Sequence, residues 1–309
     1  MKFWVGITDS DWFKLCSEAN ADEVNFWQPS GAVHFRALEP GGLFLFKLHS
    51  PDDFIVGGGF FVRFTFLPAS LAWEAFGSKN GVSSLDDLVR RVHKYRRGDT
   101  NANPTIGCSI LTEPFYLTRD QWIPMPKSWG KSIVRGKTYD TAESDGLALF
   151  NQIRDRLRVQ QGFHGDMPIL ETANVAQYGA EYLTKARLGQ GAFRVLVTDA
   201  YQRRCAITGE RTLPALDAAH IRPYAKNGPH HVSNGLLLRS DWHRLYDEGY
   251  ITVTPDLRVE VSQRIRQEFE NGRDYYAQHG TALKFVPKAS WERPSREHLD
   301  WHNQNVYKS

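Results

Sequence analysis

The stretch of residues 205–247 constrains this chain more than any other, because it holds three polar side chains in a set order. His220 comes first, in an Ala-His-Ile-Arg-Pro context. Asn234 opens an apolar run, and His243 follows Ser240. This order predicts a strand that ends at His220 and a short helix that carries His243, with Ser240 as its N-cap.

These residue types meet the needs of phosphodiester hydrolysis, which requires an activated water and neutralised charge at phosphorus. A neutral imidazole can accept a proton from water, so His220 is the candidate general base. His243 is the first-choice metal ligand, and Asp247, four residues later, shares its helix face. Imidazole and carboxylate donors suit Mg²⁺ or Mn²⁺, with Co²⁺ or Ni²⁺ as alternatives. Asn234 can hydrogen-bond the backbone on both sides of the loop and fix the direction of His220.

Each of these residues has an ordinary structural interpretation when it is taken alone. A single histidine near a strand end is most often structural, and an asparagine before glycine usually marks a turn. His230 and His231 are interpreted as loop residues, although a histidine pair can bind metal. The combination of His220, Asn234 and His243 in one order is what indicates a site.

Charge is unevenly distributed along the chain. The net charge of +3 is small and by itself implies no nucleic-acid partner. Residues 185–247, however, contain ten Lys or Arg against five Asp or Glu. Such a local excess suits a phosphate backbone, although a solvated basic face would have the same composition.

The three cysteines are far apart and form no Cys-x-x-Cys pair, which argues against a disulfide framework or an all-cysteine zinc site. A reducing cytoplasm is therefore the expected location. No run approaches the roughly 20 apolar residues that span a bilayer, so no membrane partner is expected.

The remaining patterns predict an α+β fold, with a first domain at residues 1–140, a helical connector at 141–184 and a second domain at 185–309. Strands are predicted at residues 3–7, 43–48, 54–66, 105–111 and 122–123, and a hairpin at 250–261. Helices are predicted at residues 11–18, from a cap at Ser83 and Ser84 to the basic run 90–97, and at 143–159, 187–203 and 298–307. The helix at 143–159 follows from the spacing of Leu147, Phe150, Ile153 and Leu157. The sequence leaves open whether it packs on a domain or only separates the two.

Five motifs lie between residues 185 and 305: R-L-G-Q-G-A-F-R, R-R-C-A-I-T-G, L-D-A-A-H-I-R-P, N-G-L-L-L-R-S-D-W-H-R-L-Y-D-E-G and W-H-N. Together they resemble the HNH (ββα-metal) nuclease family found in bacterial restriction endonucleases. The resemblance implies that His220 is the general base, Asn234 the middle asparagine and His243 the metal-binding histidine.

One position departs from the family pattern. Many members carry Asp or His immediately before the base, where it binds the metal, but this chain has Ala219. Asp217 lies two residues earlier on the same face of the strand. Asp217 and Asp247 are therefore equal candidates for the second ligand.

The N-terminal part contains F-W-V-G-I-T, N-F-W-Q-P-S-G, F-R-A-L-E-P-G-G-L-F-L-F-K-L-H-S-P and I-V-G-G-G-F-F. These segments resemble EVE domains of the PUA-like superfamily, which implies a β-barrel-type reader domain with helices. EVE and related SRA domains read modified cytosines by taking the base out of the duplex, which requires stacking surfaces and hydrogen-bonding groups. A loop is expected to carry Phe26, Trp27 and Gln28 into the base pocket, with Trp12 and Trp73 as further walls. Any one of these aromatic residues can instead belong to the core.

The two resemblances together imply a modification-dependent (type IV) restriction endonuclease. Its partner would be double-stranded DNA containing 5-methylcytosine or 5-hydroxymethylcytosine, and a double-strand break predicts a homodimer. Arg187, Arg194 and Arg222 would hold phosphates, and the basic run 90–97 would hold DNA near the reader. Two alternatives remain: a non-catalytic modified-base or RNA-binding protein with a vestigial nuclease fold, and an HNH nuclease with a conventional sequence-specific target.

Overall fold

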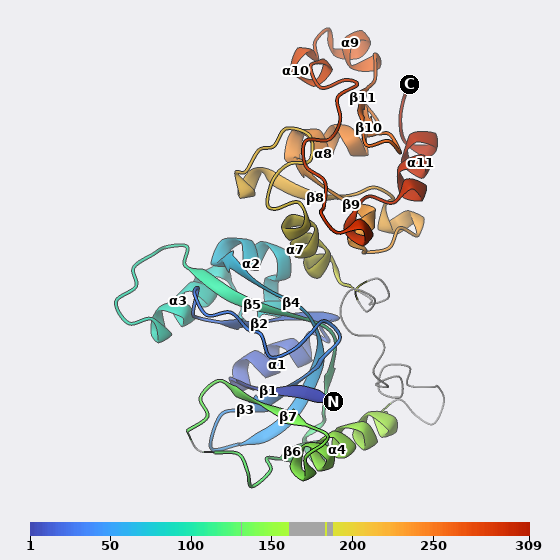
Figure 1. Cartoon of the computed structure of the whole chain (residues 1–309). Helices are drawn as coiled ribbons and strands as arrows, with labels where there is room; N and C mark the ends of the chain where they lie inside the picture. The colour runs from blue at the N-terminus through green and yellow to red at the C-terminus, as the bar shows by residue number, and fades with distance from the viewer. Residues whose placement is uncertain (131, 161–182, 184–187) are drawn as a thin grey trace. The chain divides into compact units, whose positions relative to one another are not determined.

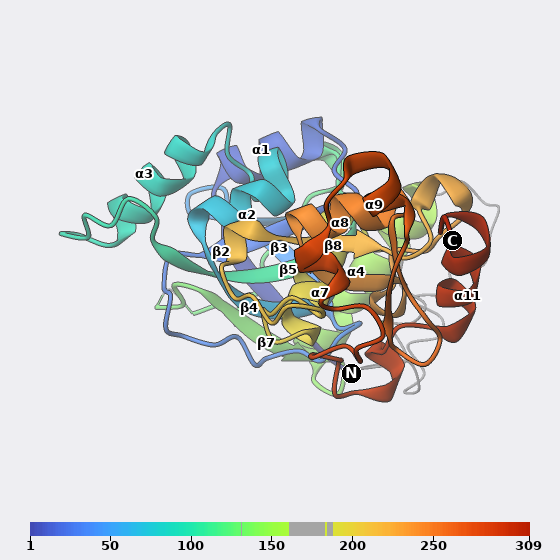
Figure 2. The same cartoon turned by 90° about the horizontal axis from the view of Figure 1, so that it is seen from above.

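The computed structural model describes residues 1–130, 132–160, 183 and 188–309 (Figures 1 and 2). The chain divides into two compact units, Met1–Ala192 and Phe193–Ser309. Within the described residues, no helix combines the length and the apolar character that crossing a membrane requires.

The first unit is built around one seven-stranded sheet (Figure 1). It contains β1 (Lys2–Thr8), α1 (Ser10–Glu18), β2 (Glu23–Gln28), β3 (Leu43–Leu48), β4 (Phe54–Pro68), α2 (Ala69–Phe76), α3 (Leu85–Tyr95), β5 (Thr105–Tyr116), β6 (Ile123–Pro124), β7 (Gly136–Asp140) and α4 (Ser144–Gln160). The strand order is β2-β5-β4-β3-β1-β7, and β6 pairs with β4. β1 and β3 are parallel, whereas the other neighbours are antiparallel. The unit is thus a mixed α+β fold, and its EVE and PUA-like assignment remains a prediction.

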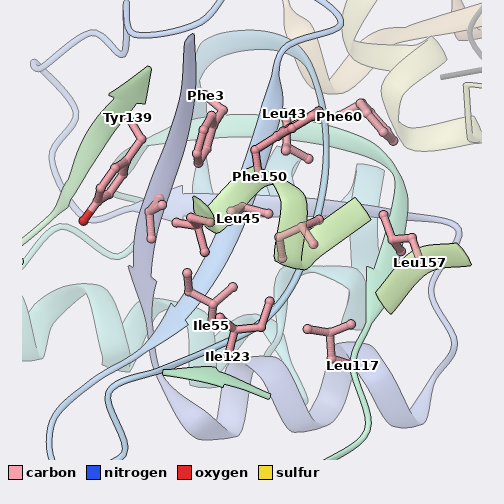
Figure 3. Packing of buried hydrophobic residues seen from close by; sticks show 13 residues of the cluster. Phe3, Leu43, Leu45, Ile55, Phe60, Leu117, Ile123, Tyr139, Phe150 and Leu157 are labelled. Carbon is pink, nitrogen blue, oxygen red and sulfur yellow. The ribbon is translucent and has the colours of Figure 1, made fainter. Parts of the chain in front are cut away.

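Helices pack on both faces of this sheet. Successive side chains of a strand point to opposite faces, so alternate residues of β3 belong to different buried clusters. Leu43 and Leu45 of β3 belong to a buried cluster that includes Phe150 of α4 (Figure 3). Phe44 of the same strand belongs to a second cluster, which includes Trp12 of α1. The helix that the sequence left unplaced, α4, therefore packs on the first unit.

The predicted periodicity of this helix is wrong at its first position. Leu149, Phe150, Ile153 and Leu157 are buried, whereas 47% of Leu147 is exposed. The core-facing stripe begins at Leu149, so it still follows the helical period but starts two residues later than expected.

The segment that carries Phe26, Trp27 and Gln28 is a strand, and the predicted loop is wrong. All three residues lie in β2 and pair with residues 107–109 of β5. The same strand begins with the fully buried Glu23, Val24 and Asn25 in the sheet interior. The backbone ladder to β5 therefore stabilises the segment as a strand despite its polar residues.

The second unit contains α7 (Gln190–Ala200, from its fourth residue on), β8 (Leu216–His220), β9 (Gly235–Arg239), α8 (Ser240–Asp247), β10 (Ile251–Val253), β11 (Val259–Val261), α9 (Arg264–Phe269), α10 (Arg273–Tyr276) and α11 (Arg296–Asn305). Short 3-10 turns occur at Tyr224–Lys226 and Val232–Asn234. β10 and β11 form the predicted hairpin. α7 ends before the predicted Arg203, because Gln202 and Arg203 adopt positive φ angles of 55° and 59°.

α8 is held in place by the last helix. His302 of α11 stacks on Tyr246 of α8 with ring centroids 3.8 Å apart. Its Nδ1 lies 2.8 Å from the Thr252 hydroxyl of β10. Burial lowers the pKa of His302 to about 4, so the ring is neutral at pH 7. This neutral, buried contact fixes the helix that carries His243.

Candidate functional site

Two antiparallel strands, β8 and β9, and the helix α8 that follows them (Figure 1) carry or border the three predicted site residues. His220 ends β8 and pairs with Gly235 of β9, which directly follows Asn234. The apolar residues Leu236, Leu237 and Leu238 are fully buried, which anchors β9 in the core. β9 leads directly into α8, which carries His243. The unit therefore has the predicted ββα arrangement.

Ser240 is not the N-cap of α8, so that prediction is wrong. Arg239 occupies the cap position, and Ser240 is the first residue of the helix. The Ser240 hydroxyl instead donates a hydrogen bond to the Ala215 carbonyl, 3.2 Å away. This hydrogen bond ties the first turn of the helix to the segment before β8.

Asn234 ties together the loop between β8 and β9. Its buried side chain accepts a hydrogen bond from the Arg222 amide through Oδ1 at 2.9 Å. Its Nδ2 donates to the carbonyl oxygens of Arg222 and Pro229, each at 2.9 Å. The bridging role that the sequence predicted for Asn234 is present in these three hydrogen bonds.

His220 is held between two other rings. Phe193 of α7 stacks on it with centroids 3.9 Å apart and an interplanar angle of 11°. His220 Nε2 lies 2.9 Å from Nδ1 of His230. Burial, followed by repulsion from His230 and His243, lowers the pKa of His220 to about 4, although Asp247 acts in the opposite direction. His220 is therefore neutral at pH 7 and able to accept a proton.

His243 contacts both candidate metal-ligand carboxylates. Its Nε2 lies 3.2 Å from Oδ2 of Asp247, one helical turn later. Its Nδ1 lies 3.4 Å from Oδ2 of Asp217 on β8. Burial lowers the pKa of His243, but hydrogen bonds and charge from Asp247 and then Asp217 outweigh it, so the pKa is raised overall.

The donors around His243 suit a hard divalent ion, because they are one imidazole and two carboxylates. Asp217 and Asp247 contact opposite nitrogens of the ring, so only one of them can share an ion with His243. In keeping with this, the described residues contain no group of three or more His, Cys, Asp or Glu side chains arranged to hold a metal. The arrangement fits an ion with two protein ligands, completed by phosphate oxygens and water.

A cavity of about 450 Å³ lies in the first unit. Of the residues predicted for a base pocket, Trp12, Phe26, Trp27 and Gln28 line it. Trp12 is almost fully buried and makes edge contacts with Phe26, at 5.3 Å, and with Phe46. Trp27 is anchored at one edge, because its Nε1 donates to the Asn80 carbonyl at 3.0 Å.

Trp73, predicted as a further wall of a base pocket, does not line this cavity. It lies on α2, which follows the far end of β4. Sequence alone could not place it, because an aromatic residue on a helix can face any neighbour.

Polar groups surround part of the cavity lining. Asp9, His49 and Tyr95 all belong to it, and Asp9 accepts a hydrogen bond from the Tyr95 hydroxyl at 3.3 Å. Asp9 Oδ1 also lies 3.4 Å from His49 Nε2. Gln28 donates from Nε2 to the Val33 carbonyl, which orients its amide. The cavity therefore combines aromatic faces with oriented polar groups.

The basic run 90–97 is partly engaged within the first unit. Arg90 and Arg91 form ion pairs with Asp87 in the first turn of α3. Arg96 pairs with Asp99 and donates to the carbonyl oxygens of Pro29 and Thr105. The positive charge of the run 90–97 is therefore less available to DNA than the sequence suggests.

Comparison with known proteins supports the assignment of the second unit. Residues 205–254 match the family model described as HNH endonuclease. These residues form an HNH endonuclease domain. A search of curated protein sequences finds no match.

Solved structures that are similar to the chain include three examples. They are a tyrosine-to-phenylalanine variant of ZmASCH from Zymomonas mobilis (8% identity, 50% of this chain and 99% of that chain covered, TM-score 0.33), a serine-to-alanine variant of the same protein (8%, 48% and 94%, 0.31) and the modification-dependent TagI restriction endonuclease (13%, 93% and 76%, 0.28). At these identities and TM-scores, the similarities carry no conclusion about this chain.

The arginines predicted to hold phosphates near the HNH domain differ in their surroundings. Arg222 follows β8, donates from Nε to the Lys226 carbonyl at 2.8 Å and stacks over Trp301. Arg194 is partly exposed on α7. Arg187 lies outside the described residues. Their binding of phosphate remains a prediction.

Sequence reasoning missed two residues of the HNH site. His230 was interpreted as a loop residue, but its ring contacts His220 directly. Phe193 lies in a motif that resembles the HNH family, but its position in the sequence does not reveal that its ring stacks on His220. The adjacent pair of His230 and His231 was the available signal, but nothing local distinguished the histidine that reaches His220.

Proposed function

We propose that this protein is a modification-dependent DNA endonuclease, in which the first unit binds a flipped modified cytosine and the HNH domain hydrolyses the backbone. The nuclease part is carried by one observation: His220 at the end of β8, Asn234 directly before β9 and His243 on α8 belong to one ββα unit within the HNH match at residues 205–254. The reader part is supported by the aromatic cavity of the first unit.

Neutral His220 takes a proton from a water aligned on the scissile phosphorus. The water oxygen bonds to phosphorus as the bond to the 3′ oxygen breaks, and the leaving oxygen takes a proton from solvent. A bound divalent ion would neutralise charge on the phosphate and on the leaving oxygen. Asn234 holds the loop that follows the base, so the direction of His220 is set before substrate binds.

Asp247 would share a divalent ion with His243, and Asp217 would orient the other ring nitrogen. Asp247 is the more exposed of the two, at 56% against 33%, and makes the shorter contact with His243. A carboxylate on the other nitrogen of a ligating histidine is the usual orienting partner.

Two amide variants test this division of roles. Asp247→Asn should weaken Mn²⁺ binding by about 100-fold, whereas Asp217→Asn, which keeps an oxygen acceptor for the ring, should weaken it by about 10-fold or less. Isothermal titration calorimetry with Mn²⁺ measures both constants. A larger loss in Asp217→Asn would assign the metal to Asp217 instead.

The cavity suits a single nucleobase in size and chemistry. Its volume of about 450 Å³ is within the roughly 300–1,000 Å³ typical of small-molecule pockets. An extruded base needs a stacking surface and partners for its edge, which offset the cost of unstacking. Trp27 and Gln28 provide these on adjacent positions of β2.

Trp27→Ala should weaken binding to a 5-methylcytosine duplex by about 10–100-fold, because one stacked base contributes roughly 1–3 kcal/mol. Affinity for the unmodified duplex should not change. Trp73→Ala is the matched control, since Trp73 is outside the cavity. Fluorescence anisotropy with matched duplexes measures the affinities, and equal losses in the two variants would argue against the pocket.

The function as a whole is tested by digestion of plasmids that carry cytosine, 5-methylcytosine, 5-hydroxymethylcytosine or its glucosylated form, in several divalent ions. Cleavage of modified plasmids alone is the expected result. Binding without a nick would favour a vestigial nuclease. Equal cleavage of all plasmids would favour an HNH nuclease with a conventional sequence-specific target. One HNH site cuts one strand, so linear product would support the expected homodimer.

A further inference from the structure

His230 contacts the candidate base, His220, at the ring nitrogen Nε2. Whether this nitrogen carries a proton decides whether His220 can accept a proton from water. His220 Nε2 and His230 Nδ1 are 2.9 Å apart, which is a hydrogen-bond distance between two ring nitrogens. A hydrogen bond between neutral rings needs one N–H donor and one bare acceptor nitrogen. In the described part of the chain, the other nitrogen of His220, Nδ1, makes no hydrogen bond.

The direction of this hydrogen bond determines whether His220 can act as a base. If His230 donated its Nδ1–H, the lone pair of His220 Nε2 would be occupied and Nδ1 would carry the proton. No nitrogen of His220 could then accept a proton from water. If His220 donates its Nε2–H, its Nδ1 is left bare and able to accept.

We propose that His230 is a positioning residue that accepts the Nε2–H of His220 and so leaves Nδ1 of His220 as the nitrogen that takes the proton from water. This inference rests on the proposed nuclease function. It assigns His230 the orienting role that a third group plays beside a general base.

The surroundings of His230 hold it in this position. Tyr224 stacks on its ring with centroids 4.6 Å apart and an interplanar angle of 15°. Its neighbour in the chain, Pro229, is held through its carbonyl by Asn234. Phe193 supports the His220 ring from its face. The buried asparagine is thus connected to the base through the backbone that carries His230.

Asn234 is connected to His220 through two separate sets of contacts, or routes. The first route runs through the Arg222 backbone, two residues after the base. The second runs through Pro229 and the His230 ring. The two routes reach the base from both ends of the same loop, so the ring and its tautomer are set together.

Ring nitrogen chemical shifts test the tautomer directly. In protein labelled with ¹⁵N-histidine, His220 is assigned from the signals that His220→Gln removes. At neutral pH, the wild-type His220 should carry its proton on Nε2, and His230→Phe should produce a mixture of both tautomers. A wild-type proton on Nδ1 of His220 would overturn the proposal, whether or not the protein cuts DNA.

Kinetic variants test the consequence for catalysis. His230→Phe keeps a ring against Tyr224 but removes the acceptor, so kcat for plasmid nicking should fall by about 10–100-fold with KM unchanged. His230→Asn puts an amide oxygen near the position of Nδ1 and should stay within about threefold of wild type. His231→Ala is the matched control on the adjacent residue and should cut normally.

The outcomes separate this proposal from the proposed function. Equal kcat in wild type and His230→Phe, with His220→Ala inactive, would retain the nuclease and reject His230 as its positioning residue. Equal loss in His230→Phe and His230→Asn would also reject it, because an acceptor would not matter. If the wild type cuts no DNA, the nuclease function fails, and the tautomer measurement alone decides the role of His230.

Discussion

Replacing His220 with alanine is expected to reduce DNA cleavage by about 10²–10⁴-fold, the usual contribution of a general base. The reason is that the remaining site has no neutral nitrogen beside the scissile phosphate. His230 cannot substitute, because its ring is held by Tyr224 and points its Nδ1 at the position of the missing ring. Nicking of a supercoiled plasmid under single-turnover conditions measures the loss.

DNA binding should survive in the same variant. The phosphate contacts that dominate affinity come from basic side chains and not from a neutral imidazole. His231→Ala provides the control, since no hydrogen bond or ring contact joins His231 to His220 in the described part of the chain. Cleavage at the wild-type rate by His220→Ala would remove this residue from the mechanism.

Asn234→Ala should lower the free energy of unfolding of the HNH domain by about 3 kcal/mol or more. It removes three hydrogen bonds and leaves the Arg222 amide and two carbonyl oxygens without their partner. A buried polar group left unpaired costs roughly 1–3 kcal/mol. We also expect the cleavage rate to fall by about 10–100-fold, because the loop that orients the base is released.

Amide hydrogen exchange at Arg222 is the most direct measurement, since its N–H donates to Asn234. Protection at this amide should be lost in Asn234→Ala. Asn305→Ala is the control: that side chain is exposed and donates once, to the Trp301 carbonyl. Its stability should change by less than about 0.5 kcal/mol, as at most surface positions. Unchanged protection at Arg222 would contradict the bridging role of Asn234.

The HNH site was predictable from sequence because its parts are close in the chain. A strand, a turn and a helix follow one another within residues 216–247, so local patterns determine their order. The ladder between β8 and β9 then places His220 beside Asn234. The contact of His243 with Asp247 follows from helical spacing, whereas its contact with Asp217 depends on the packing of α8 on β8, which local sequence does not reveal.

Predictions failed where packing overrides local preference. The β2 segment looked like a loop because it is rich in polar and aromatic residues, but pairing with β5 makes it a strand. Leu147 has helical spacing with Phe150, yet the sheet surface meets α4 along Leu149 instead. Of the two predicted pocket residues Trp27 and Trp73, Trp27 lines the cavity and Trp73 does not.

The sequence by itself determined which chemical groups this protein carries and the order of the strands and helix that present them, because these depend on neighbours within a few turns of chain. The tertiary structure decided which groups meet. It brought the rings of Phe193 and His230 to His220, placed Asp217 of β8 against His243 of α8, and brought Trp12 and Trp27 to the lining of one cavity. Such contacts depend on strand register and side-chain packing, which bring together residues that are far apart in sequence.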